Sequence, residues 1–260
     1  MTIRVNSLSY STVSQYVNCS QRVYWEKVEQ LPKRQSMSSK MIFGIALHSA
    51  VAAFFRGIIN HVILDIDQLV CVFKIRYESC LPKGLVGNEQ AVNILCQEAK
   101  RMLELFLASK PPTNIVAIEK PIKYALTSKL DCVGQIDLVV RDTDGVLNVI
   151  DLKSTSKTPA DEMVQKYTEQ CLIYALAYKE IVKAKAWLFL RKKQPEFKTI
   201  DLDIDRIEYG EVIEKFTGVA KGISTGIHFR NRSWQCGGCP YSYLCKMETV
   251  KVQQEYSKAA

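Results

Sequence analysis

Residues 130–153 read LDCVGQIDLVVRDTDGVLNVIDLK, and this stretch decides the fold. Two runs rich in apolar and β-branched residues flank the turn pair Asp144-Gly145, which predicts an antiparallel β-hairpin. The second run is apolar enough for a buried strand, yet it ends in Asp151 and Lys153, charges that a sheet interior normally excludes. Because side chains alternate along a strand, this acid and this base point to the same face. Their position calls for a chemical explanation.

A third charged residue, Asp137, lies on the first strand of the same hairpin. Since the two strands are adjacent and antiparallel, we expect the carboxylates of Asp137 and Asp151 to converge at one edge of the sheet. Two hard anionic oxygens at one point suit Mg²⁺ or Mn²⁺. Beside that metal, Lys153 could orient or deprotonate a water, or stabilise charge on a phosphate. The alternative is a plain Asp151–Lys153 salt bridge, with Asp137 a separate buried acid.

The rest of the chain predicts an α/β fold with a mixed sheet. Helical spacing of apolar residues changes to a period of two after about residue 113. Helices are expected at about 10–28, 43–58, 65–79, 89–109, 159–182 and 206–221. Strands are expected at 114–124, 130–140, 146–153, 184–193 and 196–203. Ser7 and Ser9 offer the first helix N-caps, and Pro159 is placed in the first turn of the helix that follows the hairpin.

Composition agrees with a soluble globular protein, because apolar residues make up 47% and charged residues 24% of the chain. The net charge of +8 makes an anionic partner plausible. The polar N-terminus does not resemble a secretory signal, and the apolar stretch from Met41 to Phe55 is expected to be too short and too polar for a membrane span. Nine cysteines without such a signal indicate thiols in a reducing compartment, which predicts a cytoplasmic protein with no membrane association.

A family resemblance rests on motifs that occur in a fixed order. G-x-x-x-H at Gly44 and His48 precedes GQID at 134–137, DLK at 151–153 and a Q-x-x-x-Y pair, Gln170 and Tyr174. Together they resemble the PD-(D/E)xK nuclease superfamily, and within it the RecB-like exonuclease branch. The resemblance covers residues 44–48 and roughly 115–192. The sequence departs from the superfamily name in having no proline directly before Asp137.

The resemblance implies a restriction-endonuclease-like core and a role for each motif residue. It implies that one or two Mg²⁺ or Mn²⁺ ions bind to His48, Asp137, Asp151 and the main-chain carbonyl of Leu152. The implied catalytic set is Lys153, Asp151, Asp137, Gln170 and Tyr174. In the family Lys153 would position the attacking water, and the helix face of Gln170 and Tyr174 would approach the metal and the nucleic acid. The alternatives are a core histidine at position 48 and ordinary helix packing for Tyr174. Glu119 either adds an acid to the site or lies on a solvated strand edge.

The cysteines form a second constellation. Cys236, Cys239 and Cys245 are spaced C-x2-C-x5-C, and Cys19 would supply the fourth ligand that a Cys₄ site needs. This arrangement is similar to RecB-like members such as AddB-type subunits and CRISPR-associated nucleases, which bind a 4Fe-4S cluster. The resemblance implies such a cluster here, stapling the two ends of the chain. A structural zinc is the alternative, because spacing alone does not separate the two.

The sequence also predicts roles for the basic and aromatic residues near the C-terminal cysteines and for the five remaining cysteines. Arg230, Arg232, Trp234 and Tyr241 mix basic and aromatic groups suited to gripping a single strand. The remaining cysteines stand in apolar contexts and are expected to be core residues. They are Cys71, Cys80, Cys96, Cys132 and Cys171.

The sequence thus predicts a metal-dependent DNA exonuclease that acts on DNA ends or single strands. It is expected to be a single nuclease domain over 1–260, with a helical region at 1–110, a nuclease core at 111–204 and an iron–sulfur tail at 205–260. A helicase P-loop does not occur in the sequence, so a helicase or a recombination or CRISPR-adaptation partner would supply any unwinding. The alternatives are a structure- or sequence-specific endonuclease and a non-catalytic module that binds DNA ends.

Overall fold

The structure of the chain is a computed structural model, and it describes residues 5–33, 38–81, 88–178, 180–206 and 209–247. The chain divides into two compact units. The sheet unit comprises Ser39–Tyr124 and Cys132–Val212. The terminal unit comprises Met1–Ser38, Ala125–Asp131 and Ile213–Ala260. Each unit is described separately below.

A mixed β-sheet forms the centre of the sheet unit. Its strands are β2 (Ile115–Thr127), β3 (Leu130–Arg141), β4 (Leu147–Thr155), β5 (Ile181–Leu190) and β6 (Glu196–Leu202). Strands β3 and β4 are antiparallel, β4 and β5 are parallel, and β5 and β6 are antiparallel. A parallel pair needs a long crossover, which helix α6 (Asp161–Ala177) supplies. This arrangement confirms the predicted α/β class with a central mixed sheet.

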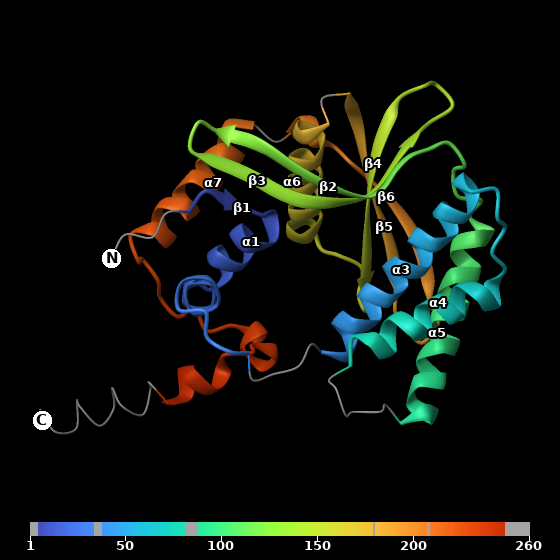
Figure 1. Cartoon of the computed structure of the whole chain (residues 1–260), viewed down its shortest axis with the longest axis horizontal. Helices are drawn as coiled ribbons and strands as arrows, with labels where there is room; N and C mark the ends of the chain where they lie inside the picture. Colours follow the sequence, from blue (N-terminus) through green and yellow to red (C-terminus); the bar gives the residue numbers. More distant parts are fainter. Residues whose placement is uncertain (1–4, 34–37, 82–87, 179, 207–208, 248–260) are drawn as a thin grey trace, which may run out of the picture. The chain divides into compact units, whose positions relative to one another are not determined.

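Helices cover both faces of this sheet. Figure 1 shows α3 (Ser39–Ile59), α4 (Ile66–Ser79) and α5 (Glu89–Ala108) on one side of β4–β6, and α6 on the other. Ile150 and Leu152 of β4 belong to the apolar core shared with the first three helices. Their neighbours Asp151 and Lys153 therefore face α6, as the alternation along a strand predicts. The charged pair lies on the side of the sheet that α3–α5 do not fill.

Helix α3 is longer than its sequence predicted. The stretch from Met41 to Phe55 was expected to be too short for a membrane span, but the helix runs from Ser39 to Ile59 and is long and apolar enough by length and composition. Several of its apolar side chains, such as Phe43, are buried in the core of the sheet unit, while Met41 and Ile59 are exposed. A core helix of a soluble protein passes the same length test, so this helix is weak support for a membrane location.

The hairpin turn between β3 and β4 is the one predicted from Asp144-Gly145. Gly145 has a φ of 81°, a left-handed conformation that glycine adopts without steric penalty. The carboxylate of Asp142 accepts hydrogen bonds from the amides of Val146 at 2.8 Å and Asp144 at 3.1 Å. Side-chain oxygens that bond to nearby amides stabilise turns in this way.

The terminal unit corrects the prediction of one helix over residues 10–28. Ser9 caps α1 (Tyr10–Asn18) as expected, accepting a bond from the Thr12 amide at 3.2 Å. The helix then breaks at Cys19, whose extended backbone has a φ of −165°, and resumes as α2 (Ser20–Val23) and a π-helical turn, η1 (Tyr24–Val28). Periodicity did not detect the break because the apolar spacing continues across it.

The C-terminal half of the terminal unit packs against this N-terminal segment. Helix α7 (Tyr209–Ser224) approaches α1 closely, since a Cβ at Gly222 would overlap the Tyr16 hydroxyl. That hydroxyl donates a hydrogen bond to the carbonyl of Ile227. Ser20 fixes the following segment, donating to the Phe229 carbonyl at 3.2 Å and accepting from the Phe229 amide at 2.8 Å. A side chain at position 222 would have to displace the end of the Tyr16 side chain and so disturb its hydrogen bond to the Ile227 carbonyl.

Two further element boundaries differ from the predicted ones. Helix α6 begins at Asp161, so Pro159 precedes its cap and does not occupy its first turn. The helix ends at Ala177, and Ile181 already belongs to β5, so the predicted end of the helix at residue 182 is wrong. The last predicted helix is shifted to 209–224, and residues 207–208 of the predicted span lie outside the described residues.

The predicted core cysteines separate into two groups. Cys96, Cys132 and Cys171 are buried, as expected. Cys71 is exposed and Cys80 is half-buried, so the prediction is wrong for these two. Cys71 lies on α4 and Cys80 caps its C-terminus. Buried and solvent-facing positions lie close together along this helix, and a small residue such as cysteine can occupy either.

This difference predicts thiol reactivities. Burial raises the pKa of Cys132 to about 11, although its hydrogen bond with Tyr124 lowers it. Because the thiolate is the reactive form, we expect iodoacetamide at pH 8 to modify Cys71 on the order of a hundredfold faster than Cys132 in the folded protein. Peptide mapping by mass spectrometry after short exposures measures both rates. Equal rates would show that Cys132 is accessible and would contradict its burial.

Candidate active site

The candidate site begins where the β3–β4 ladder ends. Paired residues run from Arg141 with Leu147 to Leu138 with Ile150. Beyond this last pair the Leu152 amide donates to the Asp137 carboxylate at 2.9 Å. A side-chain oxygen of Asp137 thus accepts the strand amide of Leu152 beyond the last of these pairs, and this bond holds Asp137 against the backbone of β4. A buried amide needs such a partner.

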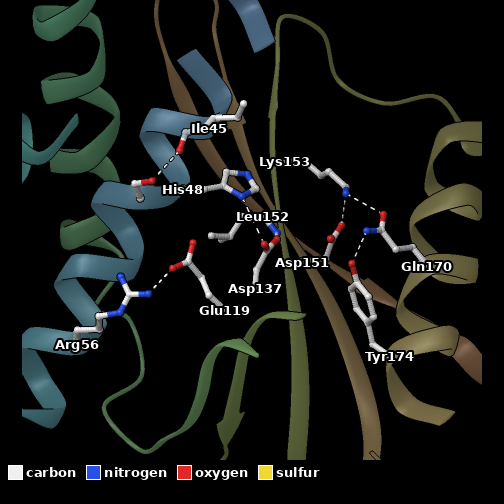
Figure 2. A network of polar contacts seen from close by, with 11 residues as sticks. Ile45, His48, Arg56, Glu119, Asp137, Asp151, Leu152, Lys153, Gln170 and Tyr174 are labelled. Atoms are coloured by element: carbon white, nitrogen blue, oxygen red, sulfur yellow. Dashed lines mark hydrogen bonds and ion pairs between the residues drawn. The ribbon is translucent and has the colours of Figure 1, made fainter. Parts of the chain in front are cut away.

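The charged pair of β4 connects to helix α6 through a short polar chain (Figure 2). Lys153 Nζ lies 2.6 Å from Asp151 Oδ2 and donates to Gln170 Oε1 at 3.0 Å. Gln170 Nε2 in turn donates to the Tyr174 hydroxyl at 2.6 Å. Gln170 and Tyr174 are four residues apart and share a helix face. The structure therefore brings together Asp151, Lys153 and the Q-x-x-x-Y pair.

His48 approaches Asp137 from helix α3. Its Nδ1 lies 3.5 Å from Asp137 Oδ1. The two side chains line a small cavity of about 10 Å³ together with Leu152 and Glu119. This volume is close to that of a single bound water. Asp151 does not line it, because its side chain is only 1% exposed and is turned to Lys153.

The carboxylates of the site differ in their electrostatics. Burial alone raises the pKa of Asp137, but His48, the Leu152 amide and Lys153 outweigh it, so the pKa lies below that of an ordinary aspartate. Burial raises the pKa of Asp151, and Lys153 opposes this rise without cancelling it. Burial lowers the pKa of Lys153, but the charge of Asp151 reverses this and raises it, so Lys153 is an ammonium. Opposed shifts of neighbouring acids are common at functional sites.

Two residues of this network were not predicted from the sequence. Tyr167 places its ring 5.2 Å from Lys153 Nζ, within cation–π range. It precedes Gln170 by three residues, so the same helical spacing that joins Gln170 to Tyr174 would have found it. Arg56 forms an ion pair with Glu119 at the rim of the cavity. Its position on α3 after His48 carries no signal that distinguishes it from a solvated arginine.

The donor types at this site fit a divalent cation. Carboxylate oxygens suit Mg²⁺ or Mn²⁺, and the imidazole nitrogen favours Mn²⁺, the transition metal of the two. Over the described part of the chain, however, no three His, Cys, Asp or Glu side chains surround a common point as metal ligands would. Asp137 and Asp151 instead bind groups of the protein, the first the Leu152 amide and the second Lys153. A bound ion would take over oxygens that now hold these partners.

The four motif cysteines lie around one cavity of the terminal unit. Cys19, Cys236, Cys239 and Cys245 line a space of about 350 Å³. Burial raises the pKa of Cys245, while Arg230 lowers it and the other three cysteines raise it, because the thiols lie near one another. Four basic side chains line the same space: Arg22, Arg230, Arg232 and Lys246. The structure thus joins the N-terminal cysteine to the three C-terminal ones.

The aromatic residues beside these cysteines differ in their exposure. Trp234 is 84% exposed, as a surface that stacks on bases requires. Tyr241 is 1% exposed, packs against Trp25 and donates its hydroxyl to the Leu31 carbonyl at 3.1 Å. The expectation that Tyr241 grips a strand is therefore wrong. A sequence pattern of mixed basic and aromatic residues does not distinguish a core tyrosine from a surface one.

Comparisons with known proteins identify the family. A model of the PD-(D/E)XK nuclease superfamily matches residues 7–246. The chain belongs to this superfamily. A solved structure of a protein from Eubacterium rectale, described provisionally as an exonuclease, is 13% identical, covers 91% of this chain and 88% of its own, and has a TM-score of 0.58. A second, SSO0001, is 14% identical over 94% of this chain and 88% of its own, with a TM-score of 0.45. No protein of curated function matches.

Membership in the PD-(D/E)XK superfamily confirms the coarser part of the resemblance. It supports nuclease activity, with DNA as the substrate that the family implies. At identities near 13% the Eubacterium rectale structure shows a shared fold. The motif residues of this PD-(D/E)XK chain lie at the end of the β3–β4 ladder, between α3 and α6.

Proposed function

We propose that the protein is a metal-dependent DNA exonuclease of the RecB-like branch. The observation that carries the proposal is the polar network at the end of the β3–β4 ladder. There His48 meets Asp137 at 3.5 Å, and Asp151 holds Lys153 at 2.6 Å. A buried carboxylate, Asp151, and a half-buried one, Asp137, beside a fixed ammonium fit phosphodiester hydrolysis, in which charge develops on phosphate oxygens.

Each residue of the network takes a role in this proposal. His48, Asp137, Asp151 and the Leu152 carbonyl would hold Mg²⁺ or Mn²⁺, which when bound supplies Lewis-acid polarisation of a phosphate oxygen. Lys153 orients the attacking water and stabilises charge on the phosphate. Gln170 fixes the Lys153 ammonium at 3.0 Å. Tyr174 is buried and bonds only to Gln170 among the contacts drawn here, so it acts as a positioning residue.

The mode of attack is tested with matched DNA substrates. We expect the protein, purified without air, to degrade end-labelled linear single-stranded DNA with Mn²⁺ or Mg²⁺ and to leave a covalently closed circle of the same sequence intact. The reason is that an exonuclease needs a free end. Product lengths on a denaturing gel report both reactions. Cleavage of the circle at the rate of the linear strand would show an endonuclease, and binding of ends without products would show a non-catalytic module.

We further propose that the four cysteines bind a 4Fe-4S cluster. The cavity of about 350 Å³ that the four cysteines line supports this, because it has room for a group of that size. Basic side chains around the cavity match the negative charge of a thiolate-bound cluster. The cluster would close a loop between the first and last segments of the chain.

The cellular setting follows from these assignments. The family match spans both units, which supports the proposal that residues 1–260 act as one nuclease domain. Reduced thiols and an oxygen-sensitive cluster favour the cytoplasm. A helicase, or a partner in recombination or CRISPR adaptation, would present the DNA ends.

A further inference from the structure

Glu119 is the second carboxylate of the cavity beside His48 and Asp137. It lies within strand β2, where its φ of 46° puts it in the left-handed region. Side chains other than glycine rarely adopt this conformation, and a glutamate has no intrinsic preference for it. Such residues gather at functional sites, where the surroundings hold them in place. Here the unusual backbone accompanies a carboxylate at the cavity wall.

Arg56 is the present partner of that carboxylate. The two side chains form an ion pair at the rim of the cavity, and Figure 2 shows Glu119 between Arg56 and Asp137. The Arg56 side chain is 51% exposed and that of Glu119 31% exposed. An exposed pair of this kind contributes little to stability. It therefore does not offset the unfavourable backbone at Glu119, and the geometry needs another explanation.

The charges around the cavity explain the backbone geometry of Glu119. Asp151 does not line it, so Asp137 and Glu119 are its carboxylates among the described residues. Asp151, the other proposed carboxylate ligand, holds Lys153 outside the cavity, so a hard divalent cation beside His48 and Asp137 gains affinity with a further anionic oxygen. Glu119 stands at the position from which such an oxygen would come.

We propose that Glu119 is a further ligand of the divalent metal, and that Arg56 competes with the metal for it. The inference rests on the proposed metal site and adds a residue to it. In the metal-free protein Arg56 neutralises Glu119. When a cation binds, the carboxylate turns from the guanidinium to the cavity. Arg56 is then released beside the metal, where its planar donors suit a phosphate oxygen of DNA.

The competition gives substitutions of the two partners opposite effects on metal affinity. We expect Glu119→Gln to weaken Mn²⁺ binding by at least about tenfold, because it removes an anionic ligand. We expect Arg56→Met to strengthen Mn²⁺ binding severalfold, because it removes the competitor. Isothermal titration of the full chain with MnCl₂, in the absence of DNA, measures both without reference to activity. Asp67→Asn is the matched control, since it breaks another exposed ion pair of the sheet unit, Asp67–Lys100.

Two comparisons separate this inference from the metal site itself. Asp137→Asn should abolish Mn²⁺ binding, and if it does not, the proposed site is wrong. If Asp137→Asn abolishes binding but Glu119→Gln binds like the wild type, the site stands and Glu119 is no ligand. If Arg56→Met weakens binding as Glu119→Gln does, the ion pair is structural and the competition is refuted. A change in the Asp67→Asn control would point to a general loss of surface charge and would also overturn the assignment.

Discussion

Replacing Lys153 with methionine is expected to lower the rate of DNA cleavage by roughly a hundredfold to ten-thousandfold. The ammonium of Lys153 is fixed between Asp151 at 2.6 Å and Gln170 at 3.0 Å. Among the described residues, no other cation contacts both of these groups. Methionine has a similar length but no donor, so the attacking water and the developing charge lose their partner. Single-turnover cleavage of linear single-stranded DNA at saturating Mn²⁺ measures the effect.

The same change has a cost in stability that must be separated from catalysis. Asp151 is 1% exposed, and removing its partner leaves a buried carboxylate, which typically costs about 3–5 kcal/mol. The double variant Asp151→Asn with Lys153→Met removes both charges, so we expect it to unfold at higher denaturant than Lys153→Met alone while remaining inactive. Lys198→Met, at an exposed lysine paired with Glu196, is the control. A folded Lys153→Met protein that cleaves DNA at the wild-type rate would contradict the catalytic role of Lys153.

The second large effect concerns iron. Protein purified without air is expected to be brown and to contain about four irons per chain, and Cys19→Ala should lose most of them. The loss should match that of Cys236→Ala, because both thiols line one cavity although most of the chain separates them. Removing either ligand also opens the link between the two ends of the terminal unit, which should lower its melting temperature. Iron analysis and thermal unfolding measure the two consequences.

Cys71→Ser provides the matched control for this result, because Cys71 is exposed and lies outside the cavity. It should retain all the iron. One zinc per chain without visible absorbance would identify the site as a structural zinc centre. Full iron content in Cys19→Ala would place the fourth ligand elsewhere.

The sequence predicted the sheet because local patterns and tertiary packing agree there. The turn glycine at 145 has the left-handed backbone that the hairpin required, and the alternation of β4 separates Leu152 in the core from Lys153 at α6. Helical spacing likewise placed Gln170 and Tyr174 on one face, where they bond to each other. A period of two or of 3.6 residues carries this information without any knowledge of distant contacts.

Features that depend on distant partners were not visible in the same way. The helix break at Cys19 accompanies hydrogen bonds between Ser20 and Phe229, residues that are 209 positions apart. Tyr241 is buried because Trp25 and Leu31 surround it, and no periodicity records those neighbours. The left-handed backbone of Glu119 interrupts an otherwise regular strand sequence. Each is a case of tertiary contacts overriding local preference.

The pairing of Ser20 with Phe229 also bears on how the protein is made. A ribosome releases Cys19 long before it synthesises Phe229 and the three cysteines that follow, so the cysteine cavity cannot form on a partly translated chain. Once Ser20 and Phe229 have bonded, the four thiols are gathered before any metal arrives. Cofactor insertion would then be a late event in biosynthesis. Chains truncated before residue 236 would lack three of the four thiols that line the cavity.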